Sequence, residues 1–400
     1  MSSTPGRREE RVAYPHLARH IQASHSNHFP RKIVKPFEGV KPRRRDALTN
    51  PFDGRKLTVN PSYATKLEDV YDSFIEEGDQ ENAAKTQAIQ EIGTFFWVSQ
   101  IDSLPDIDDA IAAARSAKES TGEDQIVGLV VYNLPDRDCS GGESSGELES
   151  DKNGLERYKA EYITPYAEKL AAASDLTFAL VVEPDAIGNI VTNTAVPFCA
   201  QAAPVYEEGI SYAIANLQLP NVHLYLDASH GGWLGWDDVL EPAAQEFSKI
   251  VEMARVQSSN STKIRGFSTN VSNYNPFHAA VPPPYTEGSN SYDESSYANS
   301  LSPHLEAAGL PSRFIIDQGR VALPDAREEW GEWCNVAPAG YGQPPGSSVS
   351  NNTHVDSIVW VKPGGESDGE CGYEGAPPAG EWFPEYAALL VENADPLIKA

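Results

Sequence analysis

Two hydrophobic segments of the chain each end in a cluster of carboxylic acids. The first segment, residues 130–139, ends with Asp136 and Asp138, and the second ends with Glu183 and Asp185. In an α/β barrel, the loops after the strands are free to vary, and they carry the catalytic groups. A pair of carboxylic acids over a sugar-sized cleft is the chemistry of glycoside hydrolysis, and the sequence favours that reaction.

Acidic residues follow other predicted strands as well. Asp227 and Asp317 end two further hydrophobic segments, and Glu366 and Asp368 follow a third. For any one of these acids, helix capping or pairing with an arginine such as Arg137 is the simpler interpretation. Repetition at five strand ends favours a shared site. Carboxylates that converge raise one another's pKa, so one of them can stay protonated near neutral pH and act as an acid.

Tryptophans accompany the acids. Trp233 and Trp236 stand in a glycine-rich segment that follows Asp227. Indole faces stack on the apolar faces of sugar rings, and we predict this use for both residues. Core packing is the better interpretation for Trp97 and Trp360, because both lie within or at the end of predicted strands.

Other chemistries find less support. His230 could be a metal ligand or a general base, but no second histidine stands at ligand spacing, so we predict a hydrogen bond to a substrate hydroxyl or to a neighbouring loop. The nucleophile elbow, the P-loop, the dinucleotide fingerprint and the H-E-x-x-H motif are all absent from the sequence. The sequence therefore predicts no metal and no cofactor.

The formal net charge of the 400-residue chain is −27 at pH 7, but basic residues gather near its start. We predict a basic N-terminal arm over residues 1–48 and one catalytic domain over residues 49–400. A catalytic domain this acidic repels nucleic acid and anionic membranes, whereas binding of a neutral polysaccharide is not excluded. The arm could bind nucleic acid, but it has few interleaved aromatics. An arm that lies on the acidic body, or a partly disordered end, is preferred.

The cysteines favour a secreted protein. The four cysteines, all in predicted loops, are Cys139, Cys199, Cys334 and Cys371. Their positions indicate two disulfides, and the sequence leaves all three possible pairings open. Glycosylation sequons begin at Asn260, Asn270 and Asn351. No signal peptide is visible at the start, and no apolar stretch has the length of a transmembrane helix.

The segments alternate in a βαβ rhythm. Seven strands are predicted at 95–99, 126–133, 177–183, 221–227, 264–269, 314–317 and 357–361. Amphipathic helices are predicted at 83–92, 107–117, 155–173, 200–217, 242–255 and 292–308. Right-handed βαβ units that close on themselves give a parallel barrel, and a doubly wound open sheet is the structural alternative.

These motifs together resemble glycoside hydrolase family 6, the inverting cellulases that act on β-1,4-glucan. Residues 130–146 resemble the family's first signature, V-x-Y-x-x-P-x-R-D-C, and residues 180–188 resemble the second, centred on Glu-Pro-Asp. Further similar stretches lie at 225–228, 231–236, 269–274, 317–320, 330–335 and 360–366. The likeness covers roughly residues 50–395, and it implies a distorted seven-stranded parallel β/α barrel with the active site at the carboxyl ends of the strands.

The resemblance also implies roles for individual residues. Asp185 corresponds to the general acid, and Asp138 to the carboxylate that raises the pKa of this acid. Tyr132 favours distortion of the sugar ring, Ser144 holds a water, and Asp368 matches the disputed direct base. Inversion places a water between sugar and base, so acid and base are expected roughly 6.5–9.5 Å apart or more. Substrate-binding positions are Trp233, Trp236, His230, Asn270, Trp333, Lys362, Glu366 and Asp227. The implied disulfides are Cys139–Cys199 and Cys334–Cys371.

Three residues depart from the family pattern. Glu143 stands at a position of small residues, Thr58 at the position of a sugar-stacking tryptophan, and Ser367 replaces an extra cysteine. The loop at 366–380 also looks shortened, which predicts a widened or partly open cleft. We expect a monomer that releases chiefly cellobiose, with an open-cleft endoglucanase as the first alternative and a noncatalytic glucan-binding protein as the second.

Overall fold

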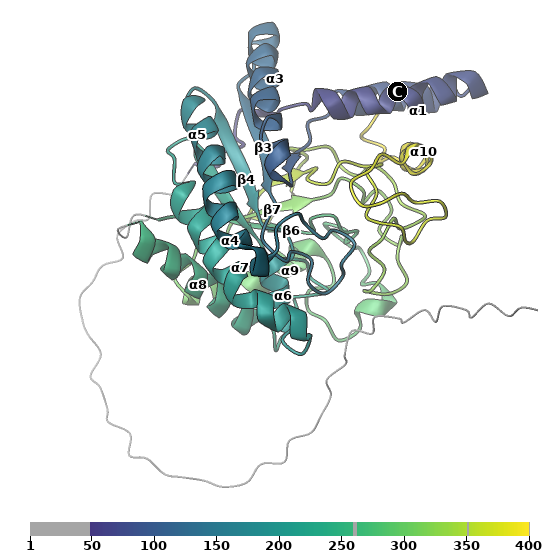
Figure 1. The fold of residues 1–400 in the computed structure, drawn as a ribbon. Coiled ribbons are helices and arrows are strands. Elements are labelled where there is room, and N and C mark those ends of the chain that lie inside the picture. Colours follow the sequence, from purple (N-terminus) through teal and green to yellow (C-terminus); the bar gives the residue numbers. More distant parts are fainter. Residues whose placement is uncertain (1–48, 259–261, 350–351, 400) are drawn as a thin grey trace, which may run out of the picture. The chain divides into compact units, whose positions relative to one another are not determined.

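One parallel sheet forms the centre of the computed structural model, which describes residues 49–258, 262–349 and 352–399 (Figure 1). Strands β3 to β8 are neighbours in chain order, and the short strands β1 and β2 both pair with β3, at its start and its end respectively. The strands are β1 Lys56–Leu57, β2 Phe96–Val98, β3 Gln125–Val131, β4 Thr177–Val182, β5 Val222–Asp227, β6 Gly266–Thr269, β7 Phe314–Asp317 and β8 Val355–Val359. The seven predicted strands are confirmed; β1 was not predicted.

Strands β2 and β8 approach each other without forming a ladder in the described part of the chain. The backbone N–H of Phe95 donates to the carbonyl of Trp360 at 2.9 Å, and Trp97 Nε1 donates to the carbonyl of Val361 at 2.8 Å. The sheet is therefore curled into a distorted barrel, as expected. A regular barrel would continue the ladder around the whole ring.

Alternate residues of each strand separate the inner face of the sheet from the outer face. On β3, Val127, Leu129 and Val131 pack in the outer core against the helices, whereas Ile126 and Val130 point into the barrel. The barrel interior is filled by side chains from opposite strands, including Val181, Tyr225, Ile315 and Val359. The doubly wound alternative is wrong, because helices would then cover this inner face too.

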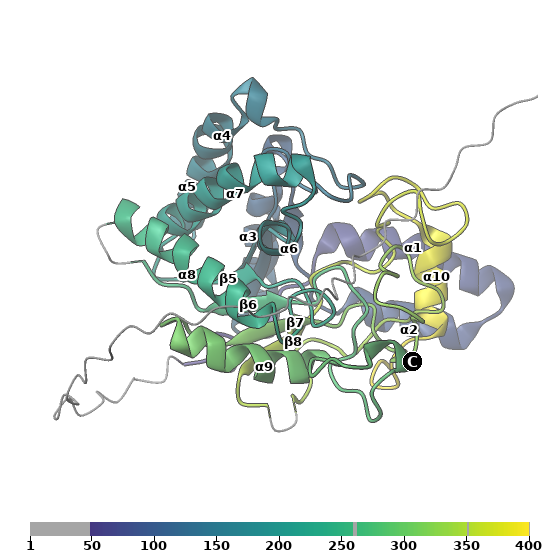
Figure 2. The ribbon, with the colours of Figure 1, turned by 90° about the horizontal axis from the view of Figure 1, so that it is seen from below.

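Helices surround the sheet, and all six predicted helices are confirmed. Figure 2 shows α5, α7 and α8 on one side and α1, α2 and α10 on the other. The helices are α1 Pro61–Glu77, α2 Gln80–Gln90, α3 Asp106–Thr121, α4 Gly154–Arg157, α5 Thr164–Ala172, α6 Ala186–Thr192, α7 Pro197–Asn216, α8 Leu240–Gln257, α9 Glu294–Ala307 and α10 Pro384–Glu392. A π-helical segment, Tyr158–Ile163, joins α4 to α5, which makes the predicted helix at 155–173.

Helix α1 was not predicted, although its sequence carries a signal. Tyr63, Leu67, Val70 and Phe74 are spaced as one buried helical stripe, and they pack in a second core with residues of α10. The Asn60 side chain caps the amino end of α1, accepting from the N–H groups of Ser62 and Tyr63. A capping asparagine followed by such a stripe predicts a helix.

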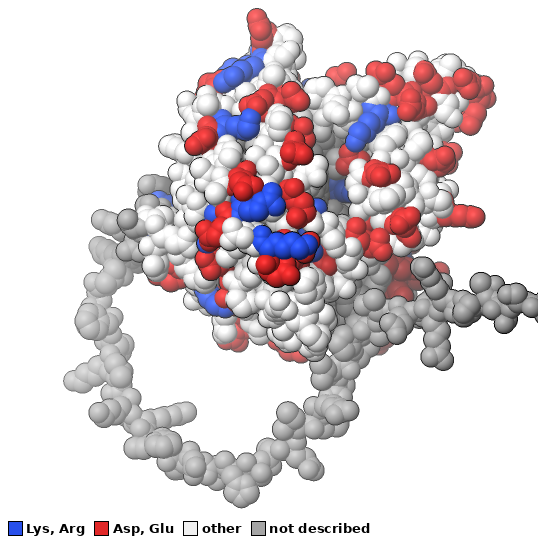
Figure 3. All heavy atoms as spheres, viewed as in Figure 1, with Lys and Arg blue, Asp and Glu red and all other residues white. Residues whose placement is uncertain are grey.

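Both implied disulfides are present, Cys139–Cys199 and Cys334–Cys371. Asn270 is fully buried, so its sequon is closed to glycosylation; Asn260 and Asn351 lie outside the described residues, as does the predicted arm over residues 1–48. None of the described helices is long and apolar enough to cross a membrane. Acidic side chains cover much of the face in Figure 3, and the basic side chains on it mostly adjoin acidic ones.

Gly128 of β3 provides a test of the barrel packing. A Cβ at this position would lie 2.5 Å from the ring of Phe95, so we expect Gly128→Ala to lower the free energy of unfolding by about 1–3 kcal/mol. The measurement is urea unfolding of the full chain. Phe95→Leu gives the control, because it makes room for the added methyl: the double variant should lose less stability than the sum of the single variants. Strict additivity would contradict this packing.

Candidate active site

Residues in the left-handed backbone region cluster where the strands end. Asp136, Asp138, Glu183 and Asp185 have φ angles between 50° and 66° at the carboxyl ends of β3 and β4. Non-glycine residues occupy this region at a cost in conformational energy, which the surrounding structure must offset. The carboxyl ends of these two strands thus carry backbone strain together with four acids.

Asp185 is partly buried and held by its neighbour on β5. Its backbone N–H donates to Asp227 Oδ2 at 2.9 Å. Burial, then the charge of Asp227, then that of Asp138, raise the pKa of Asp185 well above its usual range. A carboxyl group with a raised pKa retains its proton near neutral pH and can donate it to a substrate oxygen.

Asp227 lies beneath Asp185 and is almost completely buried, with 1% of its surface exposed. The N–H groups of Asp185 and Ser229 donate to its Oδ2 at 2.9 and 3.0 Å, and the Ser268 hydroxyl donates to Oδ1 at 3.4 Å. Burial raises the pKa of Asp227 to about 7. Asp227 thus supports the backbone of Asp185, and the predicted contact of its side chain with the substrate stays a prediction.

Asp138 is partly buried, and the loop that follows it folds back over its carboxylate. The N–H groups of Gly141 and Ser144 donate to its two oxygens at 3.2 and 2.8 Å. Burial raises the pKa of Asp138, while these backbone donors oppose the rise. The Ser144 hydroxyl makes no hydrogen bond within the described residues, so it is available to a water or to the substrate.

Tyr132 lies between Asp138 and Asp185 on the inner side of the barrel. The charge of Asp185 is the largest electrostatic cause, after burial, of the raised pKa of Tyr132. Its ring packs edge-on against Trp97, with 5.4 Å between ring centroids, and the Arg137 guanidinium lies 4.4 Å from its centroid. The Tyr132 hydroxyl has no hydrogen-bond partner in the described part of the chain, as expected for a group that meets the substrate.

Asp368 is also buried, but its environment is cationic. Its Oδ2 accepts hydrogen bonds from Arg320 Nη1 at 2.7 Å, from the Asn335 N–H at 2.9 Å and from the Tyr274 hydroxyl at 3.1 Å. Its Oδ1 lies 4.0 Å from Lys362 Nζ. Asp368 therefore pairs with Arg320, and its Oδ1 is the less occupied of the two oxygens. Sequence reasoning gave Arg320 no role, although it stands in the conspicuous Asp-Gln-Gly-Arg segment.

Lys362 and Glu366 connect Asp368 to the rest of the site. Lys362 Nζ donates to the Ser367 carbonyl at 3.0 Å and lies 5.9 Å from the centre of the Trp97 ring, and burial lowers its pKa. Glu366 accepts from Lys66 Nζ at 2.8 Å. Trp97 contacts both Tyr132, which lies beside Asp138 and Asp185, and Lys362, which lies beside Asp368. These three acids therefore belong to one site. Trp97 is therefore more than a core residue.

His230, Trp233 and Trp236 of the loop after β5 form a further group with Trp330, which lies in the loop after β7. Burial lowers the pKa of His230 to about 3, so its ring is neutral. Nδ1 accepts from the Gly232 N–H at 3.2 Å, which leaves Nε2 as the protonated donor, and this donor has no partner among the described residues. Trp236 and His230 both contact Trp330, with centroids 6.4 Å apart in each case.

The remaining residues that were predicted to contact the sugar fall into two groups, partly exposed and fully buried. Trp233 is partly exposed and donates from Nε1 to the Thr192 hydroxyl at 2.7 Å, and Trp333 is also partly exposed. Asn270 is fully buried, and its amide donates to the carbonyls of Asn275 and Asp317 at 2.9 and 2.8 Å. Its side chain thus holds a loop together, and the predicted contact of Asn270 with the substrate stays a prediction. Thr58, likewise fully buried, offers no platform.

Glu183 and Asp136, the other members of the two acidic clusters, are structural. Glu183 is buried and accepts from the Tyr158 hydroxyl at 2.7 Å and from the N–H groups of Asn133 and Leu134 at 3.2 and 3.3 Å. Burial raises the pKa of Glu183 to about 7. Asp136 accepts from the N–H of Ser150 at 3.1 Å.

Two loops meet over the site. A Cβ added to Gly369 would lie 2.6 Å from Glu143 Oε2 and 3.1 Å from Glu143 Cβ, so the Glu143 side chain rests against this glycine. Glu143 belongs to the loop after β3, and Gly369 to the loop after β8. The loop after β3 and the loop after β8 thus contact each other at this point.

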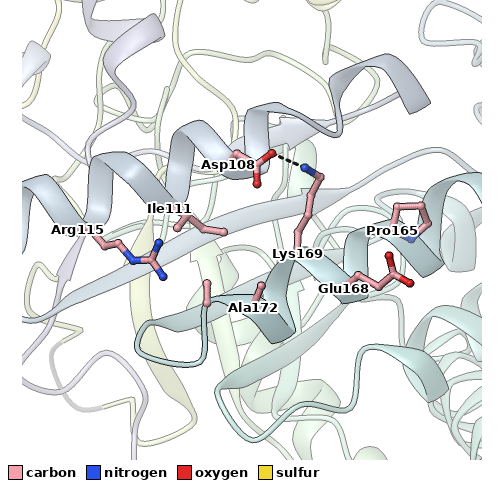
Figure 4. A pocket seen from close by; sticks show the side chains of 8 residues that line it. Asp108, Ile111, Arg115, Pro165, Glu168, Lys169 and Ala172 are labelled. Atoms are coloured by element: carbon pink, nitrogen blue, oxygen red, sulfur yellow. Dashed lines mark hydrogen bonds and ion pairs between the residues drawn. The ribbon is translucent and has the colours of Figure 1, made fainter.

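A separate hollow of about 400 Å³ lies between α3 and α5 (Figure 4). Three of its charged lining side chains are paired, Asp108 with Lys169, and Arg115 with Asp175 at 2.7 Å. No predicted site residue lines it. Among the described residues, no group of three or more histidine, cysteine and acidic side chains is arranged to hold a metal ion.

Known proteins share this fold and these motifs. The model for "Glycosyl hydrolases family 6" matches residues 52–394. The 1,4-beta-D-glucan cellobiohydrolase CEL6B of Podospora anserina is 59% identical over 351 residues, or 88% of this chain and 84% of that protein. Endoglucanase-6B of Humicola insolens is 58% identical over 346 residues, or 86% of this chain and 97% of that protein. The solved structure of endoglucanase CEL6B from Humicola insolens has a TM-score of 0.84 at 58% identity and covers 87% of this chain and 99% of that chain.

The curled parallel barrel and the paired carboxyl groups at its strand ends define a glycoside hydrolase. The chain belongs to glycosyl hydrolase family 6.

The buried carboxyl groups predict how stability depends on pH. Glu183 has a folded-state pKa of about 7 against an ordinary value of 4.5, so the folded protein binds more protons than the unfolded chain between these values. The free energy of unfolding should fall as the pH rises from about 4.5 through about 7. Glu183→Gln should remove on the order of 1–3 kcal/mol of this fall. Urea unfolding at pH 5, 6, 7 and 8 measures it, with the exposed Glu119→Gln as control. An unchanged slope in Glu183→Gln would contradict the raised pKa.

Proposed function

We propose that this protein hydrolyses β-1,4-glucosidic bonds in cellulose and related glucans with inversion at the anomeric carbon, and that it releases chiefly cellobiose. The observation that carries the proposal is the partly buried Asp185, whose pKa is raised by burial and by the carboxylates of Asp227 and Asp138. The glycosidic oxygen, which leaves with the departing sugar, needs such a proton donor. The names of the relatives, which include cellobiohydrolases and endoglucanases, support the same substrate class.

In the proposed reaction, Asp185 gives its proton to the glycosidic oxygen as the bond to the anomeric carbon breaks. Positive charge develops on the sugar, and the carboxylate of Asp138 stabilises it. A water held by the Ser144 hydroxyl attacks the opposite face of the sugar. Tyr132, with its free hydroxyl beside both acids, favours a distorted ring.

The base is assigned from the environment of Asp368. Its Oδ2 carries three hydrogen bonds, so only Oδ1 can accept a proton from the attacking water, directly or through a second water. Lys362 Nζ lies 4.0 Å from this Oδ1 and competes with the water for it. Asp138 therefore serves as the alternative end of a water chain from Ser144.

Sugar binding is assigned to the partly exposed groups around these acids. Trp233, Trp236 and Trp333 provide ring faces for stacking, and His230 Nε2 offers a hydrogen-bond donor to a sugar hydroxyl. Lys362 and Glu366 lie on the side of Asp368. All of these groups are uncharged or paired in the free protein, as suits a neutral polysaccharide.

We also propose that the protein acts outside the cell as a monomer, without nucleic acid or membrane partners and without a cofactor. Two disulfides support an oxidising compartment. The strongly acidic body would repel nucleic acid phosphates.

The first test removes the proton donor. Asp185→Asn should lower the release of reducing ends from barley β-glucan by at least about 10³-fold, because general acid catalysis is lost, while cellotetraose still binds. Asp136→Asn, a change at the neighbouring strand end whose side chain serves Ser150, is the control and should stay active. NMR of the first product formed by the unaltered protein should show the α-anomer. Turnover by Asp185→Asn at the level of the control would contradict the assignment.

The second test concerns the position of cleavage along the chain. We expect cellobiose as the main product and a small loss of carboxymethyl-cellulose viscosity per bond cleaved, because Glu143 and Gly369 bridge the cleft. Glu143→Ala removes this contact and should increase the viscosity loss per bond, whereas Glu143→Gln keeps the shape and should not. A steep viscosity loss by the unaltered protein would identify the endoglucanase alternative. Glucan binding without any cleavage would identify the noncatalytic alternative.

A further inference from the structure

Glu294, at the start of α9, is a fully buried carboxyl group that the reaction above does not use. Its Oε1 accepts from the Gly231 N–H at 2.9 Å and from Asn275 Nδ2 at 2.6 Å, while its Oε2 has no hydrogen-bond partner in the described part of the chain. Burial raises its pKa to about 7. A buried acid that forms no ion pair with any described residue is destabilising, so its presence requires a compensating role.

The glycine-rich loop after β5 is docked on the segment that leads into α9. A Cβ at Gly231 would lie 2.5 Å from the carbonyl of Ser291 and 3.5 Å from Glu294 Oε1, and a Cβ at Gly235 would lie 2.6 Å from Ser291 Cβ. The loop can approach this closely only because it lacks side chains there. The hydrogen bond from Gly231 to Glu294 fixes the loop where His230 begins its turn.

The Asn275 side chain links Glu294 to the His230 ring, because it contacts both. Its Nδ2 lies 3.3 Å from His230 Nδ1, and its Oδ1 accepts from Arg327 Nη2. Because Nδ2 is a donor, it faces the unprotonated Nδ1 and leaves the proton on Nε2. The Arg327 guanidinium in turn lies 5.6 Å from the centre of the Trp330 ring, the ring that contacts both His230 and Trp236.

We propose that Glu294 is a positioning residue for substrate recognition: through Gly231 and Asn275 it holds neutral His230 with Nε2–H directed to a glucose hydroxyl, and it holds the loop that carries Trp233 and Trp236. The inference rests on the proposed role of His230 in sugar binding. It adds that the orientation of this donor is set by a carboxyl group which never touches the sugar.

A double-mutant cycle tests the proposal on the full chain with cellotetraose. Glu294→Ala and His230→Ala should each raise KM on the order of tenfold with a smaller change in kcat, because the first removes the acceptor that holds His230 and the second removes the hydroxyl contact itself. If Glu294 acts through His230, the double variant should be little worse than His230→Ala alone. Glu306→Ala, at an exposed glutamate of the same helix, is the matched control and should leave KM unchanged. Circular dichroism and thermal unfolding establish that each variant is folded.

Asn275→Ala is a second test variant. It removes the side chain that links Glu294 to His230, while Glu294 can still accept the hydrogen bond from Gly231. It should reproduce the rise in KM, and it decides the question if the Glu294 variants do not fold. Additive effects of the Glu294 and His230 changes, or a normal KM in a folded Asn275→Ala variant, would overturn the positioning role. A normal KM in His230→Ala would instead reject the proposed sugar contact of His230, so the two failures are distinguishable.

Discussion

The hydrogen bond from the Asp185 N–H to Asp227 Oδ2 joins two carboxyl groups that have no counter-ion in the described structure. Both groups are removed from water, and each disfavours the charge of the other. Asp185 therefore keeps a proton at a pH where an exposed aspartate has lost it. An arginine in this position would reverse the effect. Arg320 lies instead on Asp368, and Arg137 lies against the Tyr132 ring. The placement of cations thus separates the acid from the carboxylates of the same site.

Covalent and steric constraints hold the loops that carry these groups. Cys139 directly follows Asp138 and is bonded to Cys199 of α7. Cys334 directly precedes Asn335, whose N–H binds Asp368 and whose side chain donates to the carbonyl of Cys371 at 3.0 Å. Each disulfide therefore fixes a loop next to a carboxylate, which suits an arrangement of strained, left-handed residues that loops alone would relax.

The strand ends, the seven strands and six of the helices follow from local patterns, because a buried strand must be apolar and a surface helix must be amphipathic. Helix α1 could have been found from the spacing of Tyr63, Leu67, Val70 and Phe74. The roles of Asp227 and Asn270 could not, since a polar residue at a strand end reads the same whether it faces a sugar or a backbone N–H. Only burial distinguishes these cases, and burial depends on residues far away in the chain.

The sequence by itself determined the barrel, its family, and the identity of the acids, because signatures and periodicity are local properties of the chain. Tertiary structure decided which acids are protonated, which are structural and which loops meet over the cleft. It brought Glu294 under His230 across 64 residues of chain, and it placed Arg320 on Asp368 rather than on Asp185. Electrostatic environment and burial are sums over neighbours in space, and these neighbours exist only in the folded protein.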